Sequence, residues 1–548
     1  MSILKKIFDP THKHNLVEIQ LSGTIPEESV KISIPFINIK SKKTMLEIDV
    51  LFDYLKNSSI KAVVIVIKQL SIGLSRANQI RNNVLELTTS GVKTYAYLKN
   101  PGNIEYFIAT AAENIFVSKW STLNLIGLSS ETFYLKKFFE RVKIEPEFIS
   151  KGNYKSAAEM FTRETISEYN IEMINSILDD NYNLFKSKIS KSRNMELEQV
   201  SEIFDNGPYF SDEALEKKLV DGVCYYDEVK DKVERDLSVN IKSINEEKII
   251  KYLKLRNSLT SLANKITRKK LTIAVVSVHG LITEGESRGG DKGLKTCGSY
   301  SLIRSLKKAE EDSSVCGVII RVFSPGGSAQ ASDIIRNKIE KITKKKPVVV
   351  SMSDVAASGG YMLSLGANKI YADEFTITGS IGVISGKFNL SKLLEFFEIN
   401  HYSISKGKHA SIYSPLKKFS DDEMKQLDEL IENMYNGFVE LVSRSRKMDF
   451  DTTEKISQGR VWTGSQALKH NLIDNTGNIN NAIEHILGEL DIDDRSNVLL
   501  KSIDTKLDLL SSNLGKAYNF DLTDVRDVFN LFENEKVLAL MPAYIKIK

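Results

Sequence analysis

The sequence has few cysteines and lacks long apolar runs. Its 548 residues include three cysteines, at positions 224, 297 and 316, without the paired spacing of a metal site or a disulfide framework. The most apolar run, residues 62–67, has the length of a strand, whereas a membrane-spanning helix needs about 20 apolar residues. We therefore expect no disulfide scaffold, no metal site and no transmembrane helix.

An excess of charge of one sign is also absent. The 75 Lys and Arg residues nearly balance the 71 Asp and Glu residues, and the net charge is +4. The basic residues are dispersed along the chain, whereas a nucleic-acid-binding protein gathers them into a patch or stripe. We expect no nucleic-acid partner.

The first residues do not have the pattern of an export signal. Such a signal has a basic start followed by an apolar core of about seven or more residues. Here Asp9 and Pro10 interrupt the apolar residues. We therefore expect residues 1–14 to form an N-terminal tail with neither an export signal nor a transmembrane helix.

Segments of the first half recur in the second half at a nearly constant separation. Residues 80–82 match residues 335–337, which lie 255 positions later. Residues 205–211 parallel residues 457–463, which lie 252 positions later. The chain is too long for one hydrophobic core, and this period indicates a duplicated domain.

We interpret the chain as two tandem copies of one α/β domain, at 15–245 and 269–490. Within each copy, buried strands alternate with helical patterns, which is typical of β-α units with a largely parallel sheet. Lysine-rich residues 246–268 have the apolar spacing of an amphipathic connecting helix.

The C-terminal tail, residues 491–548, contains two notable stretches. Residues 507–514 have helical spacing, and residues 538–545 are mostly apolar. The apolar end could dock on its own domain, on a neighbouring chain or on a membrane surface.

The second copy contains a serine in a stretch of small residues. The apolar run 347–350 predicts a buried strand, and residues 355–361 follow it as a turn that opens a helix. Ser358 would lie at the N-terminus of that helix, with small neighbours that let another backbone approach. On this stretch alone, an ordinary tight turn with a solvated serine is the favoured interpretation.

A glycine pair follows another strand of the same copy. Gly326 and Gly327 come after the apolar residues 317–320. If this loop lies beside Ser358, one of its amides and that of Gly359 could hold an oxyanion, at about 3 kcal/mol per donor. The alternative is a simple Pro-Gly turn.

A nucleophilic serine needs a base. His401 and His409 are the nearest downstream histidines, but their surroundings suggest surface residues. The other available base is a lysine kept neutral by burial, which lowers its pKa. Lys155, among small and aromatic neighbours, fits this requirement.

The two copies differ at these positions in a reciprocal way. The counterpart of Lys155 in the second copy is Ala410, and the counterpart of Ser358 in the first copy is Asn103. The glycine pair is also missing from the first copy. A site assembled across the copies would hold one complete Ser-Lys dyad, which we expect to form within one chain. Otherwise both copies are inert and the chain is a scaffold.

Four motifs together resemble those of the long, tandem-domain signal peptide peptidase A (protease IV) family. They are residues 154–157, 324–328, 356–361 and 378–382, in this order and spacing. The resemblance covers about 15–490 and implies two Clp-protease/crotonase-like domains. It implies a bacterial serine peptidase without cofactors or metal that acts on peptide substrates as a homotetramer.

The resemblance also implies roles for residues. Ser358 would be the nucleophile, Lys155 the general base and then the acid, and Ser380 the residue that orients the lysine amine. Gly326, Gly327 and Gly359 would form the oxyanion site. The expected reaction is the degradation of cleaved signal peptides and other apolar or unfolded peptides through an acyl-enzyme.

Two points stay open at this stage. The family commonly begins with a membrane-anchoring helix, so the resemblance implies inner-membrane association. No such helix is visible in this sequence, so a peripheral or cytoplasmic location also stays open. The rival functions are a crotonase-like acyl-CoA enzyme, which uses similar paired amides, and an inert oligomeric scaffold.

Overall fold

The computed structural model forms two compact units. The first unit comprises 1–128 and 180–270, and the second comprises 129–179 and 271–548. These units do not coincide with the two expected copies, because residues 129–179 of the first copy pack within the second unit. The residues whose structure is described are 9–27, 42–267, 272–288, 295–493, 495, 498–503 and 537–541.

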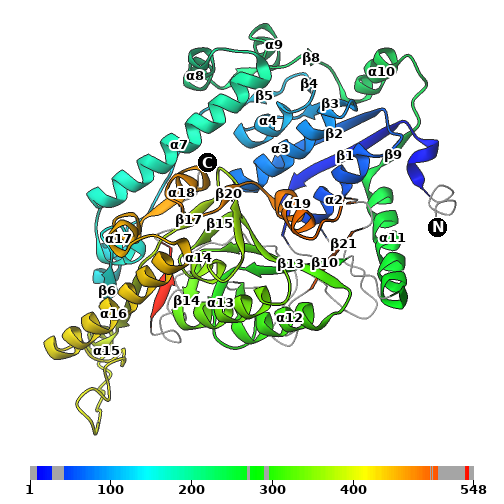
Figure 1. The fold of residues 1–548 in the computed structure, drawn as a ribbon. Helices are drawn as coiled ribbons and strands as arrows, with labels where there is room; N and C mark the ends of the chain where they lie inside the picture. The colour runs from blue at the N-terminus through cyan, green and yellow to red at the C-terminus, as the bar shows by residue number, and fades with distance from the viewer. Residues whose placement is uncertain are drawn as a thin grey trace. The chain divides into compact units, whose positions relative to one another are not determined.

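The first unit is built on a six-stranded parallel sheet (Figure 1). In the strand β2 (Ala62–Leu70), residues 62–67 are an unbroken apolar run and are buried on both faces, as is typical of parallel sheets. In spatial order the strands are β8 (Gly222–Val223), β4 (Asn114–Val117), β3 (Lys93–Leu98), β2 (Ala62–Leu70), β1 (Leu16–Gly23) and β9 (Ser243–Asn245).

Helices surround this sheet, and a helix lies where the connecting helix was expected. That helix, α11, spans Glu246–Thr267. The others are η1 (Pro10–Lys13), α2 (Met45–Lys56), α3 (Leu74–Thr89), α4 (Asn103–Ala109), α8 (Leu197–Asn206), α9 (Ser211–Glu216) and α10 (Tyr226–Leu237). The short strands β5 (Thr122–Leu123) and β7 (Tyr209–Phe210), which lie far apart in the sequence, pair antiparallel with each other. The long helix α7 (Glu168–Arg193) contributes residues to both units.

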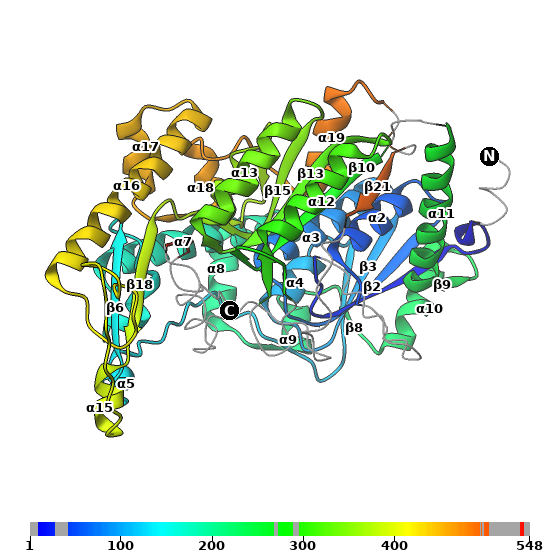
Figure 2. The same cartoon turned by 90° about the horizontal axis from the view of Figure 1, so that it is seen from below.

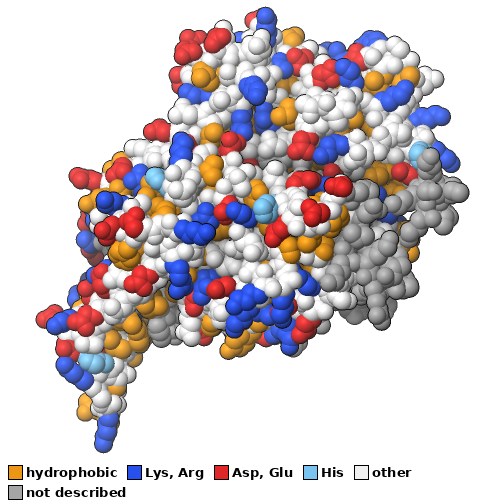
Figure 3. Space-filling model, viewed as in Figure 1, with side chains coloured by type: hydrophobic (Ala, Val, Ile, Leu, Met, Phe, Trp, Pro, Cys, Tyr) orange, Lys and Arg blue, Asp and Glu red, His pale blue; other side chains and the backbone are white. Residues whose placement is uncertain are grey.

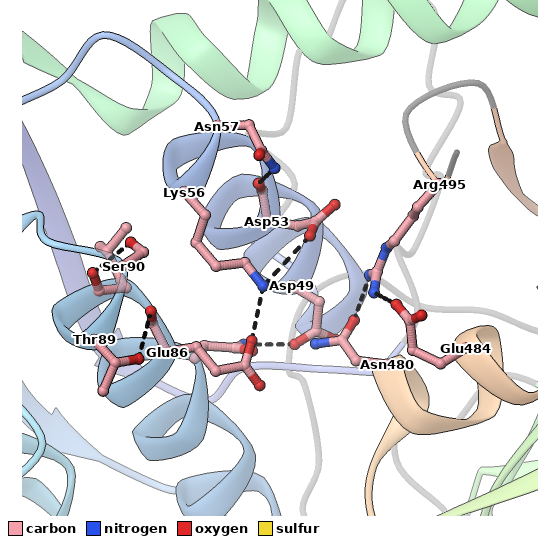
Figure 4. Close-up of polar contacts among 12 residues, drawn as sticks. Asp49, Asp53, Lys56, Asn57, Glu86, Thr89, Ser90, Asn480, Glu484 and Arg495 are labelled. Carbon is pink, nitrogen blue, oxygen red and sulfur yellow. Dashed lines mark hydrogen bonds and ion pairs between the residues drawn. The ribbon is translucent and has the colours of Figure 1, made fainter. Parts of the chain in front are cut away.

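Polar contacts join α2 to α3 within the first unit. The buried Asp49 accepts hydrogen bonds from Gln79 (2.6 Å) and Asn83 (2.7 Å). At the surface, Lys56 Nζ lies 2.8 Å from Glu86 Oε2, a contact visible in Figure 4. Exposed pairs of this kind contribute at most about 1 kcal/mol, so the buried carboxylate is the stronger link.

A separate polar group belongs to the second unit. Arg495 donates to Glu484 (2.5 Å) and to Asn480 (2.8 Å), and Figure 4 labels all three residues. Both acceptors lie on the helix α19 (Ile479–Glu489), so Arg495 ties the following segment to that helix.

The second unit contains a larger, mainly parallel sheet. The strand β13 lies between β10 and β15, and all three are almost wholly buried in the apolar core. Its strands are β10 (Thr272–His279), β13 (Val315–Ser324), β15 (Val348–Ala357), β16 (Lys369–Ala372), β17 (Ile377–Gly379), β19 (Val461–Thr463), β20 (Asn475–Thr476) and β21 (Leu499–Ser502).

A further sheet in this unit combines segments from distant parts of the sequence. The strand β6 pairs antiparallel with β18 along seven residue pairs, from Glu145 with Asn389 to Lys151 with Val383. Figure 2 shows α5 (Lys136–Arg141) and α15 (Ser391–Phe396) beyond one end of this strand pair. In spatial order the strands are β12 (Thr296–Gly298), β11 (Leu281–Thr283), β14 (Gly326–Ser328), β22 (Leu538–Leu540), β18 (Val383–Asn389) and β6 (Glu145–Lys151).

The helices of the second unit start from recognisable signals. For example, α16 (Asp421–Arg446) begins at a capping box formed by Ser420 and Glu423. The helices are α5 (Lys136–Arg141), η2 (Ser156–Ala158), α6 (Glu159–Thr162), α12 (Ser299–Glu311), α13 (Ala329–Thr343), α14 (Gly359–Ser364), α15 (Ser391–Phe396), α16 (Asp421–Arg446), α17 (Phe450–Ser457), α18 (Gly464–Lys469) and α19.

The surface and the termini bear on the remaining expectations. On the face drawn in Figure 3, basic and acidic side chains are interspersed. None of the helices in the described part of the chain is long and apolar enough to cross a bilayer. The predicted helical stretch 507–514 lies outside the described residues, whereas residues 538–540 form the strand β22 within the second unit.

Candidate active site

Ser358 occupies the turn between β15 and α14. It is fully buried, and its φ of +55° is uncommon for a residue with a side chain. The conformation is fixed from both sides, because the Ser358 N–H donates to the Gly379 carbonyl (2.7 Å) and its carbonyl accepts from the Met362 N–H (2.8 Å). Backbone strain held in this way is characteristic of functional sites.

Lys155 lies directly beside this serine. Its Nζ is 2.9 Å from Ser358 Oγ, 3.0 Å from Ser380 Oγ and 3.0 Å from the Ser380 carbonyl oxygen. Only 3% of Lys155 is exposed, and burial lowers the pKa of its amine well below the usual lysine range. These three partners carry no formal charge, so none of them is a counter-ion that would pair with an ammonium. A neutral amine in this position can accept the Ser358 proton.

Ser380 stands in the turn after β17 in a similarly constrained conformation. Its φ is +52°, and its N–H donates to the Arg460 carbonyl (2.7 Å). Its carbonyl and hydroxyl both face the Lys155 amine. The sequence placed Ser380 near the lysine only through the family resemblance, and in the structure the two side chains are in contact.

Residues 458–460 connect the lysine segment to the Ser380 turn. The Gln458 carbonyl accepts from the Tyr154 N–H (2.8 Å), and the Gly459 N–H donates to the Ile381 carbonyl (2.8 Å). Gly459 has a φ of +75°, and a Cβ built on it would lie 2.6 Å from Lys155 Cβ. Only glycine fits here, because the lysine backbone passes directly over this position.

The side chain of Arg460 extends this connection. It stacks on Tyr154, with 4.7 Å from the guanidinium carbon to the ring centroid, and donates to the Tyr154 hydroxyl (3.1 Å) and to Glu172 (2.6 Å). Tyr154 in turn donates to Glu172 (2.8 Å). No sequence pattern pointed to Arg460 or Glu172, because the repeat matched the segment 457–463 but gave no sign of its role.

The glycine pair lies against the nucleophile turn. Gly326 and Gly327 have φ values of +108° and +146°, which few other residues adopt. A Cβ built on Gly326 would lie 2.9 Å from the Gly359 nitrogen, and one built on Gly359 would lie 3.2 Å from the Gly327 nitrogen. The Gly326 N–H donates to Ser324 Oγ (3.2 Å). The Gly359 N–H opens α14 and has no acceptor within that helix, so it is suited to an anionic oxygen.

Asn103, the counterpart of Ser358, and the two histidines that were considered as bases lie in other surroundings. Asn103 begins α4, donating to the Gly127 carbonyl (2.7 Å) and accepting from the Ile126 N–H (3.3 Å). His401 is exposed, and His409 lies 3.3 Å from Asp422. Of the candidate bases considered, it is Lys155 whose side chain contacts Ser358. Across the described ranges, no group of three or more His, Cys, Asp or Glu residues could hold a metal ion.

Comparison with known proteins gives a consistent family match. The profile of Peptidase family S49 matches the chain twice, at residues 86–240 and 340–492. The chain is 33% identical to "Serine protease SPPA, chloroplastic" of Arabidopsis thaliana, over 77% of this chain and 62% of the relative. It is 33% identical to "Protease 4" of Haemophilus influenzae, over 72% of this chain and 64% of the relative. The chain thus spans less than two thirds of the length of these relatives.

Among solved structures, a ClpP1 variant from Listeria monocytogenes is similar to part of the chain. The match covers 39% of this chain and 96% of that one, at 13% identity and a TM-score of 0.24. The α/β class and the two tandem copies predicted from the sequence are confirmed by the parallel sheets and by the double family match.

Substitution of Gly459 by alanine should displace Lys155 from Ser358. The added methyl group meets Lys155 Cβ and is attached to a backbone with positive φ. Since misplacing a catalytic group by about 1 Å costs roughly 10²-fold in rate, labelling of Ser358 by a fluorophosphonate should slow by about that factor. The matched control is Gly437→Ala on α16, where a built Cβ meets nothing within 4 Å. Equal labelling rates in both variants would contradict the assigned geometry.

Proposed function

Because the chain belongs to Peptidase family S49, we propose that it is a serine peptidase that cleaves peptide bonds through an acyl-enzyme on Ser358. The observation that carries the proposal is the buried contact between Lys155 Nζ and Ser358 Oγ, at 2.9 Å. A nucleophile needs a base within hydrogen-bond reach, and the lowered pKa of Lys155 supplies that base in its neutral form.

In the proposed mechanism, Lys155 takes the Ser358 hydroxyl proton as Oγ attacks the peptide carbonyl. The carbonyl oxygen becomes an oxyanion beside the backbone amides of Gly359 and the pair Gly326 and Gly327. The resulting ammonium of Lys155 donates its proton to the leaving amine, and the C–N bond breaks. Water, deprotonated by the same lysine, then hydrolyses the ester and restores Ser358. Ser380 keeps the amine directed at Ser358 throughout.

The proposed substrates are cleaved signal peptides and other apolar or unfolded peptides. The support is the family resemblance together with apolar side chains next to the nucleophile turn. Ala357, immediately before Ser358, belongs to a buried cluster with Met173, Ile177, Ile377 and Val461. Peripheral association with the membrane from which such peptides are released is part of this proposal.

The proposed assembly is a homotetramer. Its support in the chain is an apolar tip on the second unit, at and after the end of α15. The tip consists of the exposed residues Phe396, Phe397, Ile399, Tyr402 and Ile404. A cluster of exposed apolar side chains usually marks an interaction surface, and in the proposed tetramer a neighbouring copy would cover this tip.

Light scattering should therefore give the mass of four chains. Tyr402→Asp, which places a charge on the apolar tip, should lower this mass, because a buried unpaired charge opposes association. Asp428→Ala on α16 is the control, since it removes an exposed charge from another surface. A single-chain mass for the unmodified protein at micromolar concentration would refute the tetramer.

Single substitutions of the dyad test the proposed reaction. Ser358→Ala should abolish turnover of an apolar peptide, by roughly 10⁴-fold or more, and Lys155→Ala should lower it by at least about 10²-fold. Lys344→Ala, an exposed lysine on the same unit, should leave the rate unchanged. A fluorophosphonate should label Ser358 of the unmodified chain, as an acyl-CoA enzyme or a scaffold would not. Full turnover by either dyad variant would refute the assignment.

The pH dependence of kcat/KM tests the state of the lysine. Lys155 acts as a base only when neutral, so activity should fall as the pH decreases through its pKa and reach a plateau above it. Because burial lowers this pKa, the rise should occur well below the pH at which an ordinary lysine loses its proton. A profile that keeps rising up to the usual lysine range would contradict a neutral, desolvated Lys155.

A further inference from the structure

The described end of the chain lies across the glycine loop of the candidate site. Strand β22 pairs antiparallel with β14, so that Leu540 faces Gly326, Ala539 faces Gly327 and Leu538 faces Ser328. On its other side, Leu538 pairs with Ile384 of β18. Figure 1 draws this strand in red, between the labels β6 and β14. The strand thus fills the space between two sheet edges.

Its backbone approaches the two glycine segments closely. A Cβ built on Gly326 would lie only 2.0 Å from the Ala539 carbonyl oxygen, and one built on Gly359 would lie 3.3 Å from the same oxygen. One residue further on, the Met541 N–H donates to the Pro325 carbonyl (2.8 Å). A peptide carbonyl of the chain itself therefore lies against the surface assigned to the oxyanion of a substrate.

The side chains of this strand point alternately to opposite sides, as expected for an extended peptide, and enter three apolar clusters: Ala539 joins the main core of the second unit. Leu538 and Leu540 join the cluster that contains Ala157, two residues after Lys155. Met541 joins the cluster that contains Ala357, the residue before Ser358. From Leu538 to Met541 no side chain is more than 3% exposed. The strand therefore packs both in the apolar cluster next to Lys155 and in the apolar cluster next to Ser358.

We propose that residues 537–541 are a tethered pseudosubstrate that occupies the peptide-binding groove of this chain. The inference rests on the proposed peptidase function and names the form of its substrate. A substrate would add to β14 as an extended antiparallel strand, with a small residue against the glycines and a large apolar residue in the cluster of Met541. It can bind only after the tail has left, because both use the same backbone edge.

Tethering makes this competition effective even though the strand is short. A segment linked to its site is present at a local concentration of the order of millimolar, so a weakly bound peptide competes with dilute substrate. Removal of the strand at residues 537–541 should therefore raise kcat/KM more than removal of only the residues after Met541.

Two truncated chains form the matched comparison. A chain ending at Lys536 lacks the strand, and a chain ending at Met541 keeps it. We expect kcat/KM for a dilute apolar peptide to rise on the order of tenfold in the first and to stay at the full-length value in the second. A synthetic peptide with the sequence of residues 536–541 should inhibit the shorter chain competitively and the full-length chain much less. Equal activity of both truncated chains would overturn the proposal.

A point variant covers the case in which the shorter chain does not fold. Met541→Asp places a carboxylate in the apolar cluster around Ala357 and should release the tail of the full-length chain, with the same direction of change in kcat/KM. If thermal unfolding shows that the shorter chain is destabilised and Met541→Asp does not raise activity, β22 is a permanent strand of the fold and the proposal is wrong.

A binding measurement separates this proposal from the proposed reaction. In the Ser358→Ala background, a fluorescent peptide with the sequence of residues 536–541 should bind the chain ending at Lys536, by anisotropy, and bind the chain ending at Met541 at least about tenfold more weakly. This difference would support the pseudosubstrate even if no peptide were cleaved by the unmodified protein. Equal binding would refute it, whatever the turnover.

Discussion

The burial of one amine is the constraint on which the candidate site depends. Lys155 can serve as a base only while water and carboxylates are kept away from it, since either would stabilise its charged form. Its three hydrogen-bond partners are a hydroxyl, a second hydroxyl and a carbonyl oxygen. The tight backbone around it follows from the same requirement. At Gly459 even one methyl group would occupy the space that the lysine backbone fills.

This constraint explains why the site needs residues from both copies. The lysine follows β6, and β6 is held by its long antiparallel pairing with β18 of the second copy. Residues 458–460 then connect the lysine segment to the Ser380 turn by backbone hydrogen bonds. Since these contacts join segments some 200 to 300 residues apart, the lysine is positioned by the sheet of the second unit. In the second copy the position that corresponds to Lys155 is Ala410, and the proposed reaction needs only one lysine for its one serine.

The sequence predicted the parts of this arrangement that leave a trace in composition or in the repeat. Alternating buried strands and helices indicated the α/β class, and the reciprocal absence of serine and lysine indicated their pairing. The repeat could not predict the boundaries of the compact units, because it records which segments are related and not where residues 129–179 pack. Arg460 and Glu172 were missed for a similar reason. Arg460 stacks on Tyr154 and pairs with Glu172, which accepts a hydrogen bond from Tyr154. Because Arg460 lies far from Tyr154 and Glu172 in the sequence, no local pattern could predict these contacts.

The strand β22 completes a sheet of the second unit and, in the proposed pseudosubstrate role, also limits access to the candidate site. Of the three possibilities left open by the sequence, the described residues 537–541 lie on their own unit. An apolar groove with an exposed sheet edge favours pairing with any extended peptide, including one from the same chain. The same strand adds its leucines to the cluster around Ala157 and so helps to exclude water beside Lys155. A peptide substrate that replaced it would have to exclude water equally well, since the base is neutral only in a dry site. In the proposed reaction, this requirement would favour apolar, extended peptides even before any side-chain pocket does.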